Sequence, residues 1–157
     1  MPDTAVDLDF AGGKYRFWLP MPQIVAIERG PAAHRHEGYP RSIFTMYEQI
    51  GAGLAPTQDG GTVFLGGGSA LIGDVRNIIL QGLIGGNHGM IDGEEQPVGP
   101  TTAARLIEEH VYPVRPISEA MALAWAILHS AIFGIDLKKK DETEAAPKSR
   151  SRSAKAK

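Results

Sequence analysis

Two histidines and a carboxylate stand close together in the segment His34-Arg35-His36-Glu37. In an extended segment, His34 and His36 point to the same side and could chelate a metal ion, or serve a small enzyme together with a carboxylate. No further Cys or His stands at ligand spacing, because the other three histidines fall in separate predicted elements. We therefore interpret the cluster as a polar loop and predict no metal site.

A run of three glycines and a serine, residues 66–69, precedes a predicted helix as a phosphate-binding loop would. The Lys-Ser/Thr ending of such a loop is missing. Leu71 stands where a dinucleotide fingerprint or a nucleophile elbow needs glycine. The acidic residues of the loop 92–95 lack the alternating spacing of a calcium loop. The sequence therefore predicts no catalytic residues, no cofactor and no enzyme activity.

Composition narrows the class of protein further. The chain has 157 residues, 43% of them hydrophobic, which suits one compact domain with appendages. It has no cysteine, which excludes disulfides, thiolate metal sites and a cysteine nucleophile. The absence of cysteine also fits a reducing cytosol, and the first residues lack the basic and apolar regions of a secretory signal.

Charge is distributed unevenly along the chain. Residues 138–157 carry a net charge of +5, whereas residues 1–137 carry −7. Residues 138–157 also lack periodic apolar positions, so we predict one domain over 1–137 and a disordered basic tail over 138–157. The tail has no aromatic residues that could stack on bases, so we expect no specific nucleic-acid binding.

The chain begins with a pattern typical of a β-hairpin. Polar and apolar residues alternate on both sides of a Gly-Gly pair, predicting a hairpin over residues 5–19. The polar positions carry opposite charges, so we expect Asp7 and Asp9 to face Lys14 and Arg16 across the two strands.

Helical periodicity predicts the rest of the domain. Five helices are expected, at residues 22–29, about 41–51, about 71–84, 101 or 102 to about 112, and 118–133. We interpret the glycine-rich residues 51–70 as a flexible connection and residues 87–100 as a polar loop. The predicted fold class is mainly α with an N-terminal β-hairpin (α+β), in which about five short helices pack on the hairpin.

Several residues mark the predicted helix ends. Ser42, Thr101 or Thr102, and Ser118 are expected as N-caps. The pair Gly85-Gly86 is expected to supply a left-handed stop for the third helix.

The last predicted helix is apolar on almost every side. Residues 117–135 nevertheless include Glu119, His129 and Ser130, and their uncharged core is shorter than the roughly 20 residues that a bilayer requires. We therefore expect no membrane span. Burial on two sides, in the core and in an interface with a partner or another subunit, explains the apolarity.

Three segments resemble the tail assembly protein family of gene transfer agents and related phages. They are VDLDFAGGKYRFWLPMPQIVAIE (6–28), DVRNIILQGLIGG (74–86) and TAARLIEEHVYPVRPISEAMALAWAILHSAIFG (102–134). The most recognisable element of that family is a Gly-Leu-x-Gly-Gly motif, here Gly82 to Gly86. The connection between the second and third predicted helices, residues 52–70, is longer than is usual in the family.

The resemblance implies a tail assembly chaperone that binds and shields the tape-measure protein while a long non-contractile tail forms. It also implies action in the bacterial host cytoplasm, with tube protein as a further partner and self-association as another option. The alternative is a structural tail or neck subunit retained in the particle. For the partner-binding face we predict Ile79, Leu83, Trp125 and Leu128, although a core position is the commoner one for each of these residues.

Overall fold

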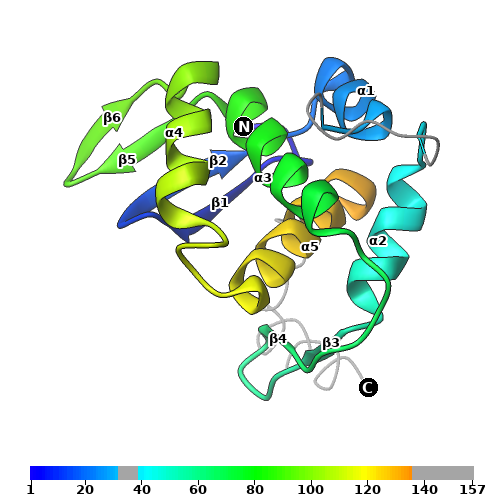
Figure 1. The fold of residues 1–157 in the computed structure, drawn as a ribbon. Coiled ribbons are helices and arrows are strands. Elements are labelled where there is room, and N and C mark those ends of the chain that lie inside the picture. The colour runs from blue at the N-terminus through cyan, green and yellow to red at the C-terminus, as the bar shows by residue number, and fades with distance from the viewer. Residues whose placement is uncertain (32–38, 136–157) are drawn as a thin grey trace, which may run out of the picture.

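The computed structural model describes residues 1–31 and 39–135. Figure 1 shows six strands and five helices in this part of the chain: β1 (Val6–Phe10), β2 (Gly13–Phe17), α1 (Met21–Arg29), α2 (Ile43–Gly51), β3 (Leu54–Pro56), β4 (Thr62–Phe64), α3 (Ile72–Gly86), β5 (Gly89–Ile91), β6 (Glu94–Gln96), α4 (Pro100–His110) and α5 (Ile117–Phe133). The predicted basic tail and the cluster at residues 34–37 lie outside the described residues.

The predicted N-terminal hairpin is present as β1 and β2. Asp7 pairs with Arg16 and Asp9 with Lys14 in the register. Their side chains form ion pairs at 3.1 Å and 3.2 Å, so the predicted charge pairing is confirmed. The turn is one residue earlier than the Gly-Gly pair suggested, because Ala11 and the glycine after it take the two positive φ values.

The predicted fold class is wrong, because the hairpin is one half of a four-stranded antiparallel sheet with the order β1-β2-β5-β6. Residues 87–100, expected as a polar loop, contribute the second half. Strands β5 and β6 have only three residues each, too few to show an alternating pattern. Asp92 and Gly93 have φ values of 51° and 80°, and this Asp-Gly turn is the signal that could have revealed the pair.

A second correction concerns residues 51–70, which were expected to be a flexible connection. Strands β3 and β4 pair there as a separate antiparallel hairpin, from Leu54 opposite Phe64 to Pro56 opposite Thr62. Gly53 sits beneath the Phe64 ring, and a Cβ at this glycine would lie 2.6 Å from the ring. The segment is therefore an element of its own, which contacts α5 through β4 and α2 through β3.

Helix α3 occupies the middle of the fold. It contacts β2 on one side and α1, α4 and α5 on the others (Figure 1). Four of its apolar residues are fully buried, namely Val75, Ile78, Ile79 and Leu83. Removing such side chains from water is the dominant stabilising contribution in a domain of this size. The predicted amphipathic helix over 71–84 is thus the core element on which the other elements pack.

The glycines at the end of α3 have a different role from the predicted helix stop. The helix continues through both Gly85 and Gly86, and Asn87 takes the left-handed conformation at φ 46°. A Cβ at Gly85 would lie 2.0 Å from the Trp18 carbonyl oxygen, and one at Gly86 would lie 1.9 Å from that of Arg16. The helix-stop prediction is therefore wrong, since the glycines let α3 lie directly against the backbone at β2.

Among the predicted helix caps, only that of α2 is confirmed. The Ser42 hydroxyl accepts a hydrogen bond from the Phe44 N–H at 3.1 Å. Helices α4 and α5 instead follow Gly99 and Pro116, and neither has a side-chain cap, so the predicted threonine cap and the Ser118 cap are wrong. Helix α4 begins at Pro100, where the missing N–H of proline leaves no unpaired donor at the first helical position.

Helix α5 is apolar enough to raise the question of a membrane span. Among the described residues, however, no helix combines the length and the apolarity needed to cross a bilayer.

Candidate protein-binding surface

The four residues predicted to bind a partner fall into two groups. Ile79, Leu83 and Leu128 are 0% exposed and belong to the hydrophobic core. Trp125 is only partly buried and lies at the surface between α5 and α2. The structure thus brings three of them together inside the fold, and leaves Trp125 as the one placed to meet another molecule.

Trp125 belongs to a group of contacting rings that we call the aromatic surface, defined by Tyr47, Trp125, His129 and Phe133. The last three are spaced four residues apart on α5, so they lie along one side of the helix. Ring centroids are 4.6 Å apart between Trp125 and His129 and 4.9 Å apart between His129 and Phe133. Tyr47 of α2 stacks on Trp125 at 5.7 Å and contacts Phe133 at 5.9 Å.

The rings of the aromatic surface are held in place by a hydrogen bond. The Tyr47 hydroxyl and His129 Nδ1 are 2.7 Å apart, which links α2 to α5. Burial raises the pKa of Tyr47 above its ordinary value, so the hydroxyl keeps its proton at neutral pH. Fixed rings lose little conformational entropy on binding, which favours contact with another molecule.

The outer end of the aromatic surface is open to solvent. Phe133 is 66% exposed, and Phe44, one turn before Tyr47 on α2, is 60% exposed. Helix α5 carries no charged residue after Glu119. Large exposed aromatic side chains grouped in this way are typical of sites for protein partners. The four-residue spacing of Trp125, His129 and Phe133 was the available signal, but the apolarity of α5 on all sides concealed it.

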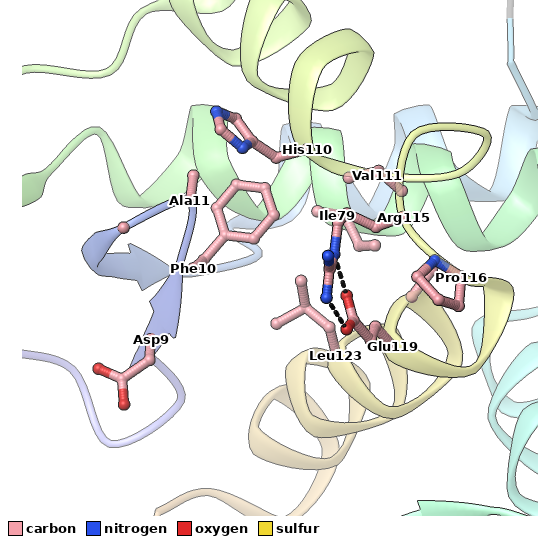
Figure 2. A pocket seen from close by; sticks show the side chains of 12 residues that line it. Asp9, Phe10, Ala11, Ile79, His110, Val111, Arg115, Pro116, Glu119 and Leu123 are labelled. Carbon is pink, nitrogen blue, oxygen red and sulfur yellow. Dashed lines mark hydrogen bonds and ion pairs between the residues drawn. The ribbon is translucent and has the colours of Figure 1, made fainter.

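A cavity of about 510 Å³ lies on another side of the molecule, between the β1–β2 turn and the start of α5 (Figure 2). Phe10, Ile79 and Leu123 provide apolar lining. Arg115 and Glu119 lie across from the Phe10 ring and pair with each other through two hydrogen bonds, of 3.0 Å and 2.5 Å. The cavity could accommodate a small apolar group.

The polar groups of this cavity are already engaged with the protein itself. His110 packs edge-on against the Phe10 ring at 6.2 Å. The Arg115 ion pair lowers the pKa of Glu119 through the hydrogen bond first and the positive charge second, so that carboxyl stays ionised. A general acid at neutral pH needs a raised carboxyl pKa, so Glu119 is poorly suited to that role.

A second apolar cavity, of about 630 Å³, lies between the first half of α3 and α4. Leu80 and Ile107 contribute to its lining, and the Arg76–Glu108 ion pair, with 2.7 Å between Nη2 and Oε1, is also part of it. This ion pair joins α3 to α4, so we assign it a role in holding the two helices together.

One buried carboxylate lies in the first turn of α3. Asp74 is 2% exposed and accepts a hydrogen bond from the Tyr39 hydroxyl. Its other oxygen is 3.2 Å from Arg41 Nη1, in an ion pair that lacks hydrogen-bond alignment. Burial, followed by the hydrogen bond to Asp74 and its negative charge, raises the pKa of Tyr39 to about 12. These contacts hold the segment that precedes α2 against the first turn of α3.

Within residues 1–31 and 39–135, no group of three or more His, Asp or Glu side chains is placed to hold a metal ion. Comparison with protein-family models, with curated proteins and with solved structures finds no significant match to this chain. The surface of the protein and the sequence resemblance are therefore the indications of its function.

Proposed function

We propose that this protein is a phage-type tail assembly chaperone, which binds the tape-measure protein and shields it until tube protein polymerises around it. The observation that carries the proposal is the aromatic surface, where Phe133 is 66% exposed at the end of a row of contacting rings. A tape-measure protein exposes long apolar helices before the tube encloses them, and such helices aggregate unless another surface covers them.

The resemblance of residues 6–28, 74–86 and 102–134 to the tail assembly family also supports this function. The Gly-Leu-x-Gly-Gly motif has a physical reason in this fold, because its last two glycines allow α3 to approach the backbone at β2. That contact helps to build the core under α5, and α5 in turn presents Trp125, His129 and Phe133. The motif would therefore preserve the scaffold, while the aromatic surface would make the contact.

Co-expression with the tape-measure protein of the same tail gene cluster tests the proposal. The tagged full-length protein should retain the tape-measure protein in the soluble fraction and co-purify with it. A folded, soluble bait that brings down no tape-measure protein would refute the proposal.

Mass spectrometry of purified particles separates the proposal from the alternative of a structural tail or neck subunit. A chaperone should be absent from mature particles or scarce in them. A fixed number of copies in every particle would instead assign the protein to the tail structure.

A further inference from the structure

The charges of the described surface indicate what kind of partner the aromatic surface can accept. The described residues include seven Lys/Arg and thirteen Asp/Glu. Six of the seven cations lie within 4.0 Å of a carboxylate of the same chain, in the pairs Lys14–Asp9, Arg16–Asp7, Arg41–Asp74, Arg76–Glu108, Arg105–Glu109 and Arg115–Glu119. The uncompensated charge of this part of the protein is therefore negative.

Part of this negative charge lies beside the aromatic surface. Glu48 follows Tyr47 on α2, is exposed, and forms no ion pair with the described residues. No cation follows Glu119 on α5. Aromatic faces themselves attract ammonium and guanidinium groups. A partner with Lys or Arg beside its apolar residues would thus be attracted twice, by the Glu48 carboxylate and by the rings.

The shape of the aromatic surface favours a helix. Trp125 and Phe133 are eight residues apart, which corresponds to about 12 Å along α5 and to about two helical turns. Apolar side chains at i, i+3, i+4 and i+7 of a partner helix would cover this length. We propose that the aromatic surface docks a basic amphipathic helix of another protein, with Lys or Arg residues beside its apolar stripe.

Two other occupants fit less well. Residues 138–157 are basic, but their only apolar side chains are Ala and Pro, so this tail offers little area to cover the rings. In a second copy, residues 1–31 and 39–135 would bring their own excess of carboxylates against that of the first, and like charges facing each other disfavour association.

This inference rests on the proposed function, since the helix would belong to the tape-measure protein, but it can be tested with synthetic peptides. Two labelled helical peptides would share one leucine stripe and carry either Lys or Glu beside it. Fluorescence anisotropy with the full-length protein should show at least tenfold tighter binding of the Lys peptide. Raising the salt from about 50 mM to about 300 mM should weaken this binding. Equal affinity for both peptides would overturn the inference.

Matched variants locate the site. Phe133→Ala should weaken binding of the Lys peptide about tenfold or more, the contribution expected of one covered phenylalanine. Val114→Ala removes a side chain of similar exposure, 61%, from the turn before α5 and should leave binding unchanged. Equal effects of the two variants would exclude the aromatic surface.

Two further results would assign the surface to another occupant. Tighter binding of the Glu peptide after Lys138, Lys139 and Lys140 are all replaced by serine would assign it to residues 138–157 of the same chain, because the lost positive charge alone would weaken that binding. A dimer that dissociates as the peptide binds would assign it to a second copy.

If tape-measure capture succeeds but is unaffected by Phe133→Ala, only this inference fails. If the Lys peptide binds at the aromatic surface while capture fails, only the chaperone function fails.

Discussion

Replacing Gly86 by alanine should destabilise the protein, although alanine is the better helix former. A Cβ at this position would lie 1.9 Å from the Arg16 carbonyl oxygen and 2.6 Å from its carbonyl carbon. Ordinary contacts between heavy atoms are about 3.5 Å, so α3 and β2 would have to separate by more than 1 Å at this point, by a rough estimate. The neighbouring hydrogen bond from the Arg16 N–H to the His88 oxygen, at 2.9 Å, resists that separation.

The expected magnitude follows from two opposing effects. Overpacking against backbone atoms costs about 3 kcal/mol, the upper end of the usual range, because a carbonyl group cannot rotate away as a side chain can. The helix propensity of alanine returns at most about 1 kcal/mol. The net loss for Gly86→Ala is therefore about 2 kcal/mol, which corresponds to a decrease in Tm of about 4–8 °C for a chain of this length.

Gly73→Ala provides the matched control on the same helix. Its Cβ would meet only the Pro31 Cγ, at 3.7 Å, an ordinary contact. This variant should be as stable as the wild type or slightly more stable. Urea unfolding followed by far-UV circular dichroism gives both free energies, provided the m-value is unchanged. Equal stability of Gly73→Ala and Gly86→Ala would refute the packing argument. So would full stability of Gly86→Asn, which a left-handed helix stop would tolerate.

Three further variants test the core and the junctions. Tyr39→Phe should lose less stability than the wild type between pH 10 and pH 12, because the raised Tyr39 pKa keeps the proton on the folded state while the unfolded state releases it. Urea titrations across this window measure the difference, and parallel curves would contradict it. Asn87→Ala should cost about 1–3 kcal/mol in the same assay, because Asn87 Oδ1 accepts the hydrogen bond of the buried Val98 N–H at 2.9 Å. Leu128→Ala should cost about 2–5 kcal/mol in thermal unfolding, and an unchanged Tm would show that Leu128 is not a core residue.

Elements in which apolar residues recur with a clear helical or strand period could be predicted from the sequence. Helices α1, α2 and α5 begin and end within about two residues of their predicted limits, and the hairpin of β1 and β2 carries the predicted ion pairs. Such elements are specified by their own alternating or helical pattern, which local reasoning can detect.

Elements specified by their neighbours could not be predicted in the same way. Strands β5 and β6 gain their stability by pairing with β2 and with each other, and three residues each are too few to show a period. The role of Gly85 and Gly86 likewise depends on Trp18 and Arg16, about 70 residues earlier in the chain, whose carbonyl groups lie against α3. From the local sequence alone, a glycine pair at the end of a helix predicts a helix stop. Only the packed structure shows how closely the two glycines approach the backbone at β2.

The aromatic surface could be predicted from the sequence only in part, for a related reason. Helix α5 is apolar on almost every side, so its sequence does not indicate which residues face inward. The structure places Leu128 in the core and Trp125 at the surface, and it adds Tyr47 from α2, which no pattern within α5 could reveal. The exposure of Phe133 follows from its position in the last turn of α5, beside the end of the packed core.

Photocrosslinking from the aromatic surface tests whether this surface contacts the tape-measure protein during tail assembly. A photoreactive phenylalanine analogue replaces Phe133 in the full-length protein, and irradiation takes place in cells that are assembling tails. We predict a crosslink to a basic amphipathic helix of the tape-measure protein, and none when the analogue replaces Val114, which is similarly exposed. Crosslinks from position 133 only to a second copy, to residues 138–157 of the same chain or to other proteins would contradict docking of the tape-measure protein at this surface.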